Sequence, residues 1–321
     1  MSSNVTHIPV ALEECIKLLA PAITNKKNPV LIDATLGLGG HAKVFLERFE
    51  NLKLIGIDRD LGALEIAKSN LAQYVDQVCF IHNTYDQIQF ALSQADVEAA
   101  DAILFDLGVS SMQLDQVDRG FSYSQEAPLD MRMDQRSLLS AAEVVNSYEE
   151  SDLSRLIADN ADEKFARRIA KAIVAARPIT TTSQLAEVVV AAIPAPARRT
   201  GGHPAKRTFQ AIRIEVNKEL EILERALQIA IDATKSGGRV AVLTYHSGEN
   251  RIVKRVFSES ERDANVQTTA SPFMHESQSG ERRTRRVRAP KHPSSKEQTL
   301  NRRAKSARLR VLEKTLVGVG N

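Results

Sequence analysis

The sequence predicts an α/β fold, in which a mostly parallel sheet is covered by helices on both faces and carries an inserted helical domain. Four short apolar segments in the first third of the chain alternate with helical patterns. Strands that are apolar throughout and separated by helices are typical of a parallel sheet buried on both faces. A fifth apolar segment follows the fourth only after about 130 residues, whereas an ordinary crossover is far shorter. A helical domain is therefore expected after the fourth strand.

The first four strands are defined by short apolar runs, three of which end in an aspartate. They are expected at residues 30–33, 54–58, 78–81 and 103–106. A glycine-rich turn at 36–40 follows the first strand and leads into a helix. Asp60 is expected to cap the next helix, because an aspartate side chain can accept hydrogen bonds from the free amides of a first turn.

The second half of the chain is expected to contain the inserted domain, followed by the remaining helix and strands of the sheet domain. Residues 116–207 have the pattern of loops and helices without a buried strand. Apolar residues at helical spacing then predict one long helix over 209–231, before a fifth strand at 239–245. Residues 258–306 are expected to be mobile, and 307–312 to form a last strand. The expected domains are the first part of the sheet domain at 1–115, the inserted substrate-recognition domain at 116–207, and the second part with a basic C-terminal segment at 208–321.

Charge is unevenly distributed along the chain. The net charge is +3, but residues 281–310 hold 12 Lys and Arg against two Glu, and the remainder is mildly acidic. A basic C-terminal segment on an acidic body indicates a polyanionic partner, with nucleic acid preferred. The alternative is a solvated segment without a partner.

Cysteine spacing and hydropathy indicate the cellular compartment in which the protein is expected. Cys15 and Cys79 are the two cysteines, and their spacing fits neither a zinc nor a redox motif, so we expect a reducing compartment and no metal site. The N-terminus has no signal pattern, and the longest apolar run, at 188–193, is too short to span a membrane. We therefore expect a cytoplasmic protein without a membrane partner. The oligomeric state stays open, a homodimer included.

The turn after the first strand predicts a cofactor that contains a ribose. Gly37 and Gly39 let the backbone approach a ligand, and Asp58, 19 residues after Gly39, can accept both hydroxyl hydrogens of a ribose. The spacing also fits a dinucleotide fingerprint, so NAD is an alternative, as is a structural turn without a ligand. Asp33 suits the cationic methionine end of S-adenosylmethionine and would repel a pyrophosphate. Asp106 adds a second acid, so the residues favour S-adenosylmethionine.

Longer motifs follow the ends of the predicted strands. They are Asp33-Ala34-Thr35 with Gly39-Gly40-His41, Asp106 to Ser111 with Gln113-Leu114-Asp115, Arg119 to Ser122, Pro128 to Asp134, His203-Pro204-Ala205 with Arg207 to Ala211, and Tyr245-His246-Ser247. Together they closely resemble the RsmH (formerly MraW) family of small-subunit rRNA cytosine-N4 methyltransferases. The resemblance covers nearly the whole chain, and the run from Pro128 to Asp134 is highly specific.

This resemblance implies a class I (Rossmann-like) S-adenosylmethionine-dependent methyltransferase sheet. It also implies transfer of a methyl group to the exocyclic N4 amine of a cytosine in the decoding region of 16S rRNA, within the small ribosomal subunit. A side chain at Gly39 or Gly40 is expected to clash with the cofactor. With the residues of the turn included, the expected cofactor contacts are Asp33, Gly37, Gly39, Gly40, His41, Asp58, Tyr85, Asp106 and Gln113.

The chain departs from the family pattern at a few positions. The usual His-Ser-Leu-Glu-Asp is His246-Ser247-Gly248-Glu249-Asn250 here, so a charge is lost at position 250. Tyr85 stands where members commonly have Phe, and either ring can pack against an adenine. Asn301-Arg302-Arg303 replaces the usual Asn-Pro-Arg.

Methyl transfer depends on positioning more than on acid–base strength, because the methyl group must lie in line between the sulfur and the nucleophile. The cytosine amine is a poor nucleophile, and a hydrogen-bond acceptor beside it can localise its lone pair and take a proton. Candidate acceptors are Asp106, Asp130 and His246, together with backbone carbonyls near Asp106.

Basic residues of two segments are candidates for RNA binding. They are Lys164, Arg167, Arg168 and Lys171 on one helix face, and Arg282, Arg283, Arg285 and Arg286 in the C-terminal segment. Two other interpretations compete with an rRNA methyltransferase. One is an NAD-linked oxidoreductase, and the other is a non-catalytic RNA-binding or assembly factor that retains a cofactor fold.

Overall fold

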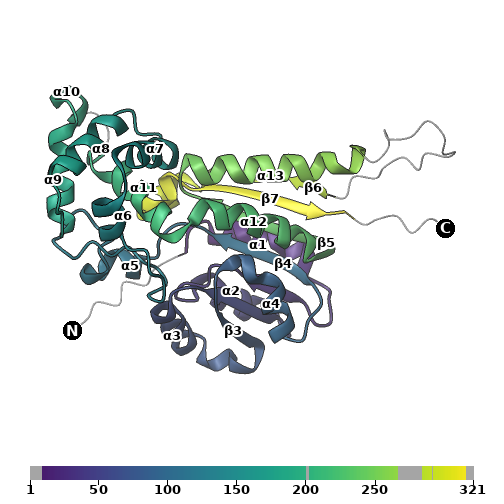
Figure 1. Cartoon of the computed structure of the whole chain (residues 1–321). Coiled ribbons are helices and arrows are strands. Elements are labelled where there is room, and N and C mark those ends of the chain that lie inside the picture. The colour runs from purple at the N-terminus through teal and green to yellow at the C-terminus, as the bar shows by residue number, and fades with distance from the viewer. Residues whose placement is uncertain (1–8, 200–201, 267–283, 291, 316–321) are drawn as a thin grey trace. The chain divides into compact units, whose positions relative to one another are not determined.

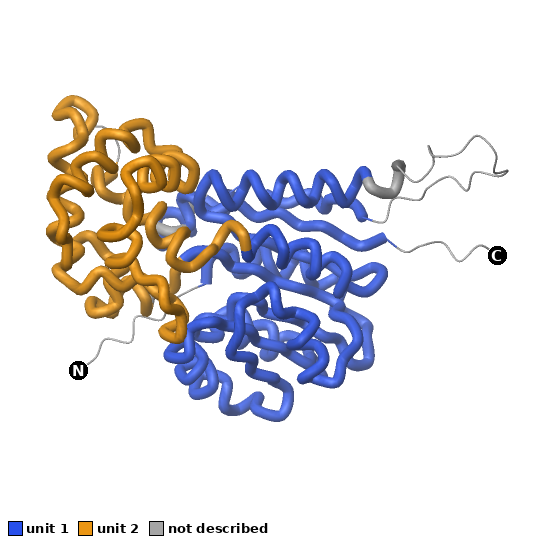
Figure 2. The backbone as a smooth tube through the Cα atoms, in the orientation of Figure 1, with its two compact units in different colours: residues 1–108, 222–321 blue, residues 109–221 orange. Residues whose placement is uncertain are grey.

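A seven-stranded sheet organises the first and last parts of the chain. The computed structural model describes residues 9–199, 202–266, 284–290 and 292–315. The chain divides into a sheet unit, residues 1–108 with 222–321, and a helical unit, residues 109–221 (Figure 2). No helix of the described residues is long and apolar enough to cross a membrane.

The sheet has the strand order β3-β2-β1-β4-β5-β7-β6 (Figure 1). Its strands are β1 (Val30–Asp33), β2 (Lys53–Asp58), β3 (Val78–His82), β4 (Ala100–Asp106), β5 (Thr234–Thr244), β6 (Thr284–Val287) and β7 (Arg308–Lys314). Strands β1 to β5 are parallel to one another, whereas β7 is antiparallel to both β5 and β6. The strands expected from the apolar runs are therefore confirmed, including the last one.

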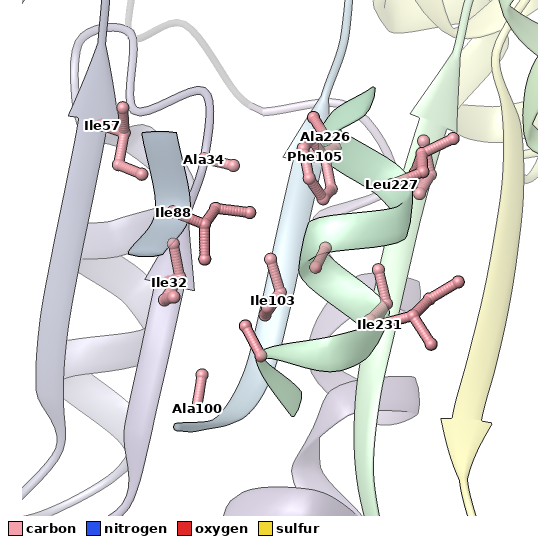
Figure 3. Packing of buried hydrophobic residues seen from close by; sticks show 14 of the residues in the cluster. Ile32, Ala34, Ile57, Ile88, Ala100, Ile103, Phe105, Ala226, Leu227 and Ile231 are labelled. Atoms are coloured by element: carbon pink, nitrogen blue, oxygen red, sulfur yellow. The ribbon is translucent and has the colours of Figure 1, made fainter. Parts of the chain in front are cut away.

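Helices cover both faces of the sheet. They are α1 (Leu12–Ile23), α2 (Gly40–Arg48), α3 (Leu61–Asn70), α4 (Ile88–Gln94), α12 (Glu219–Asp232), α13 (Ser247–Val266) and α14 (Ser295–Leu300), with 3-10 turns η1 (Ala72–Gln77), η2 (Tyr85–Gln87) and η4 (Arg302–Lys305). Ile32 and Ile103 pack with α4, α12 and α13 on one face (Figure 3). Leu31 and Leu104 pack with α1, α2 and α3 on the other face. Because successive side chains point to opposite faces, burial on both faces requires strands that are apolar throughout.

The helical unit has a core of its own. Its helices are α5 (Ser111–Asp115), α6 (Ala141–Ser147), α7 (Glu150–Ala161), α8 (Ala166–Ala175), α9 (Thr182–Ala192), α10 (Ala195–Arg198) and α11 (Lys206–Asn217), with a 3-10 turn η3 (Val117–Arg119). Leu153, Ile169 and Leu185 are fully buried in its centre. Thr181 and Gln184 form a capping box at the start of α9, which satisfies free amides of the first turn. No β-strand is present among the described residues of 109–221.

The structure corrects the prediction of one long helix over 209–231. The helix ends at Asn217, and Lys218 has a left-handed φ of 50° before α12 begins. The Asn217 side chain fixes this break, since it accepts a hydrogen bond from Met133 N and donates one to Met131 O, each over 2.8 Å. Phe209 therefore belongs to the core of the helical unit. The unit boundaries fall after residues 108 and 221, whereas the sequence pattern placed them after 115 and 207.

The expected mobile segment at 258–306 is also corrected where the structure describes it. Residues 284–287 form β6, which pairs with β7, and 295–300 form α14. Arg285 pairs with Glu313 of β7, so basic residues that look solvated in the sequence are partly anchored in the sheet. Residues 267–283 lie outside the described part of the chain.

Candidate functional site

Three aspartates lie at one edge of the sheet. Asp33, Asp58 and Asp106 are the last residues of β1, β2 and β4. These strands are parallel, and their register places Asp33 beside Gly56 of β2 and Leu104 of β4. The carboxyl ends of parallel strands form the ligand-binding edge of open α/β sheets, especially where the strand order reverses. The reversal here lies between β1 and β4, so the carboxylates occupy the expected ligand edge.

The glycine turn is fastened to this edge by its backbone. Gly37 N donates a hydrogen bond to Asp58 Oδ2 over 2.7 Å. Gly37 and Gly39 have φ values of 53° and 81°, in the left-handed region that favours glycine. Gly39 is also the residue that precedes α2. The conformation of the turn therefore requires these two glycines before any ligand is considered.

Gly40 is restricted by the packing of the protein as well. A Cβ atom at Gly40 would lie 2.8 Å from Pro9 Cγ, closer than van der Waals contact allows. At Gly39 the nearest atom to a Cβ would be Leu71 Cδ1 at 3.1 Å. Side chains at both positions would thus crowd the protein itself, and the expected clash with the cofactor stays a prediction.

Burial and mutual repulsion raise the pKa values of two of the aspartates. Asp33 is 2% exposed, and burial together with the charges of Asp106 and Asp58 raises its pKa to about 7. Burial likewise raises the pKa of Asp58 to about 6, although its oxygens accept hydrogen bonds from Gly37 N and Asp60 N. A carboxylate has further lone pairs to accept ligand hydroxyls. The site therefore has a surplus of negative charge that a cationic ligand would relieve.

Asp106 is held by a group of polar side chains from the sheet unit. Tyr245 Oη donates a hydrogen bond to Asp106 Oδ1 over 2.5 Å. Asp106 N donates to Thr35 Oγ1 over 2.6 Å, and Asp106 Oδ2 lies 3.7 Å from His41 Nδ1. The second ring nitrogen of His41 contacts Val10 O at 3.1 Å. His41 and Asp106, expected as cofactor contacts, are therefore brought together at this edge.

Tyr245 is a site residue that the sequence analysis did not select. Its hydroxyl is buried beside Asp106, and burial with that negative charge raises the pKa of Tyr245 well above its usual value of 10. The phenol therefore stays protonated and remains a hydrogen-bond donor. The available signal was its position directly after β5, in the motif Tyr245-His246-Ser247.

His246 is oriented by a second residue that the sequence analysis did not select. Glu249 is 2% exposed, and its Oε2 accepts hydrogen bonds from Tyr245 N over 2.7 Å and His246 N over 3.2 Å. His246 Nε2 lies 3.2 Å from Glu249 Oε1. The carboxylate thus fixes the chain between β5 and α13. It also holds His246 at the start of α13.

Tyr85 lies just after β3, at the start of η2. Its ring packs edge to face against Phe105 of β4, with 5.7 Å between centroids. Since β3 is next to β2, the ring follows a strand that adjoins the one ending in Asp58. An adenine contact at Tyr85 stays a prediction.

Two of the expected site residues belong to the helical unit. Gln113 forms a capping box with Ser110 in α5, where its Oε1 accepts a hydrogen bond from Ser110 N. Asp130 accepts hydrogen bonds from Arg132 Nε over 3.1 Å and Nη2 over 2.6 Å. This guanidinium helps hold the pKa of Asp130 below its ordinary value, against the opposing effect of burial. Asp130 therefore orders the loop before α6 and is a weak proton acceptor.

The basic candidates differ in their surroundings. Lys164, Arg167, Arg168 and Lys171 are all exposed around α8 and form no ion pair with the described residues. Arg285 and Arg286 pair with Glu313 and Glu261, over 2.6 and 2.8 Å. Arg282 and Arg283 lie outside the described residues. The structure thus separates an exposed unpaired stripe on α8 from partly neutralised arginines on β6.

Comparison with known proteins identifies the family. The model of the MraW methylase family matches residues 4–315. The chain belongs to the MraW methylase family. It is 48% identical to the ribosomal RNA small subunit methyltransferase H of Mycobacterium leprae, over 99% of this chain and 87% of that protein. It is 49% identical to the protein of the same name from Renibacterium salmoninarum, over 96% of this chain and 94% of the relative.

Among solved structures, an rRNA methylase from Streptococcus thermophilus matches with 11% identity and a TM-score of 0.41, over 95% of each chain. Family membership makes this chain a methyltransferase with a class I sheet, and sets aside the oxidoreductase and the non-catalytic factor. A methylase with this sheet takes its methyl group from S-adenosylmethionine. The donor is a cation, which fits the surplus of negative charge of Asp33, Asp58 and Asp106.

Proposed function

We propose that this methylase transfers the methyl group of S-adenosylmethionine to the exocyclic N4 amine of a cytosine in the decoding region of 16S rRNA, within the small ribosomal subunit. The names of the relatives support rRNA of the small subunit as the substrate. The motifs from Pro128 to Asp134 and Tyr245 to Ser247, which resemble the cytosine-N4 methyltransferases, support the base and the atom.

The observation that carries the proposal is the position of Asp106 at the ligand edge. Its Oδ1 accepts from Tyr245 and its backbone amide donates to Thr35, so the carboxylate is fixed rather than free to rotate. A fixed acceptor beside an exocyclic amine favours the geometry in which the nitrogen lone pair is available. Asp106 is therefore the preferred acceptor. His246 is the second and weaker candidate, because its Nδ1 already accepts a hydrogen bond from Glu249 N and its Nε2 faces Glu249 Oε1.

The other residues of the edge bind and orient the donor. Bound S-adenosylmethionine supplies an activated methyl group on a sulfonium. Asp58 accepts hydrogen bonds from the ribose hydroxyls, Asp33 faces the cationic methionine end, and the ring of Tyr85 packs against the adenine. Gly37 and Gly39 keep the turn in the left-handed conformation that leaves its backbone open to the ligand.

The exposed stripe around α8 supports RNA binding by the helical unit. Four cations without partners among the described residues can exchange counterions for phosphates. Backbone contacts of this kind position an RNA without choosing its base. We therefore assign recognition of the RNA mainly to residues 109–221, and binding of the donor to the sheet unit together with the turn that carries Gln113.

The test is methylation of unmethylated small subunits with isotopically labelled donor, followed by digestion and mass spectrometry of the nucleosides. We expect label in N4-methylcytidine from one 16S position. Naked 16S rRNA in a parallel reaction distinguishes free RNA from the assembled subunit as substrate. Label in another nucleoside would overturn the assignment of base and atom, and an absence of label from both substrates would overturn the rRNA assignment.

A further inference from the structure

The sheet unit contains a basic pocket whose lining includes none of the strand-end aspartates. The pocket has a volume of about 210 Å³ and lies between α13 and the strands β6 and β7. Figure 1 shows α13 alongside these two strands. Its apolar lining on the helix side includes Phe257, which is 1% exposed and packs in the core. Its charged residues are Lys254, Arg286, Arg308 and Arg310.

The basic side chains face the pocket because side chains alternate between the two faces of a strand and repeat once per turn along a helix. On β7, Leu309 and Val311 pack in the core on the α1 side of the sheet, so Arg308 and Arg310 point to the opposite face, toward α13. On α13, position 254 follows position 250 by one helical turn. Two strands and a helix thus present positive charge to one small volume.

Little of this charge is neutralised. Arg286 pairs with Glu261 over 2.8 Å. Lys254, Arg308 and Arg310 have no ion pair with any residue that the structure describes. Burial, with the charges of Arg286 and Arg308 nearby, lowers the pKa of Arg310 below its ordinary value. Like charges held together on rigid elements are unfavourable without an anion, which distinguishes this pocket from an ordinary solvated surface.

Asn250 leaves the positive charge of Arg310 without a carboxylate partner at this position. Arg310 Nε donates a hydrogen bond to Asn250 Oδ1 over 3.0 Å. The motif that this chain otherwise resembles has an aspartate there, and a carboxylate would form an ion pair with Arg310. With Asn250 the guanidinium keeps a hydrogen-bond partner but no opposite charge. The departure seen in the sequence therefore has a physical consequence in the pocket.

We propose that this pocket binds a backbone phosphate of the RNA substrate, with Arg308, Arg310 and Lys254 as its ligands. The proposal rests on the proposed rRNA methyltransferase function. Guanidinium groups match phosphate oxygens in a bidentate geometry, and the RNA of the proposed function carries a phosphate at every nucleotide. The pocket lies beside the end of β5, since Arg308 pairs with Thr244, the residue before Tyr245. Lys254 is seven residues into α13 from Ser247, which is roughly 10 Å along the helix axis. A phosphate held there belongs to a nucleotide close to the target base.

The first experiment is the double variant Arg308→Gln/Arg310→Gln, compared with Lys17→Gln/Lys27→Gln. The control pair is exposed, lies in the same unit and removes the same charge. Binding of a 16S rRNA fragment would be titrated over a range of salt concentrations. The pocket variant should lower the slope of log affinity against log salt by roughly 0.7–0.9 per charge, and the affinity at 0.1 M salt about five- to eightfold per charge. The control pair should have a smaller effect on both the salt slope and the affinity for RNA.

The second experiment adds a charge instead of removing one. Asn250→Asp should pair with Arg310 and lower RNA affinity, while affinity for S-adenosylmethionine, measured by calorimetry, stays unchanged. Because no contact is deleted, loss of folding does not confuse this result. An unchanged salt slope in both pocket variants would overturn the proposal.

Two further outcomes separate this proposal from its alternatives. If the wild type methylates small subunits but the pocket variants bind RNA normally, the pocket assignment fails and the proposed function stands. If the wild type neither binds nor methylates rRNA, the proposed function fails. Tight binding of inorganic phosphate alone, abolished in Arg308→Gln/Arg310→Gln, with unchanged RNA binding, would assign the pocket to a free anion and overturn the RNA proposal.

Discussion

Tyr245 and Asp106 are joined by a hydrogen bond of 2.5 Å between the phenol and a carboxylate oxygen, although 139 residues separate them in the chain. The bond connects the ends of β5 and β4, which are neighbours in the sheet. It holds the preferred acceptor in one orientation. Since the helical unit is inserted between these two strands, the pair forms only when the sheet closes around the insertion.

Tyr245→Phe should slow methyl transfer while binding of S-adenosylmethionine changes little. Hydrogen bonds to charged groups contribute about 1.5–3 kcal/mol, so the single-turnover rate should fall roughly 10- to 100-fold. Tyr74→Phe in η1 is the control, because no hydrogen bond of its hydroxyl is present among the described residues. Equal rates for wild type and Tyr245→Phe would show that Asp106 does not depend on the phenol.

Asp58→Ala should weaken binding of S-adenosylmethionine by about 1.5–3 kcal/mol, since charge-assisted hydrogen bonds to the ribose are lost. The variant also removes the acceptor of Gly37 N, so part of the loss reflects a looser turn. Asp58→Asn keeps one acceptor oxygen, so its affinity for S-adenosylmethionine should lie between those of the wild type and of Asp58→Ala. Calorimetric titration measures all three proteins, and an alanine variant that binds as tightly as wild type would place the ribose elsewhere.

Affinity for S-adenosylmethionine should rise with pH between about 5.5 and 7.5. Asp33 and Asp58 have pKa values raised to about 7 and about 6, and the cationic donor binds best when both are ionised. Binding should therefore release protons in this window, with a slope of up to tenfold per pH unit for each carboxylate. Titrations in buffers of different ionisation enthalpy count the protons, and Asp33→Asn should remove the upper part of the dependence.

The stability of the free protein should change in the opposite direction. A raised pKa means that the folded state holds its proton more tightly than the unfolded chain does. Between about pH 4 and 7 the folded state thus binds more protons, and the free energy of unfolding falls as pH rises. Thermal unfolding of the wild type and of Asp33→Asn, followed from pH 5 to 8, should show a smaller decline in the variant. Parallel declines in the two proteins would contradict the assignment to Asp33.

Gly40→Ala should destabilise the protein through Pro9 and not through the cofactor. The added Cβ would lie 2.8 Å from Pro9 Cγ, and overpacking of this kind costs about 1–3 kcal/mol. Pro9→Ala should relieve the clash, so the double variant should regain stability that Gly40→Ala loses. Melting temperatures of the four proteins form a double-mutant cycle, and a strictly additive cycle would show that the clash lies elsewhere.

The sequence predicts those features of the fold that depend on local pattern. Asp33, Asp58 and Asp106 could be selected because each ends an apolar strand, and the carboxyl ends of parallel strands meet at one edge. Tyr245 and Glu249 were missed because their roles arise from contacts with Asp106 and with backbone amides after β5. Nothing in their spacing reveals those contacts.

Other differences also have a physical reason in distant contacts. The helix break at Lys218 has no glycine or proline to mark it. It is stabilised by Asn217, which bonds to a loop more than 80 residues earlier. Arg285 looks solvated in the sequence because its partner, Glu313, lies 28 residues away on the neighbouring strand. Charge alone therefore predicted a partner for the C-terminal segment but not which of its cations are neutralised.

The stripe around α8 gives the last prediction. Replacing Lys164, Arg167, Arg168 and Lys171 by Gln should lower RNA affinity and reduce the slope of log affinity against log salt by roughly 2.8–3.6, if each cation replaces one counterion. Arg167, Arg168 and Lys171 are exposed on α8, and Lys164 is exposed just before it. The opposite face of the helix, with Ile169 and Ile173, is buried. The variant should therefore fold normally.

The control for this variant is Arg155→Gln/Lys218→Gln in the same unit, in which both exposed cations already have carboxylate partners, Asp152 and Glu215. That pair should change the salt slope by less per charge than the α8 variant does. Affinity for S-adenosylmethionine should be the same in both variants, because neither touches the strand-end aspartates. An equal loss of salt slope per charge in the control pair would show that the stripe around α8 is not a specific RNA contact.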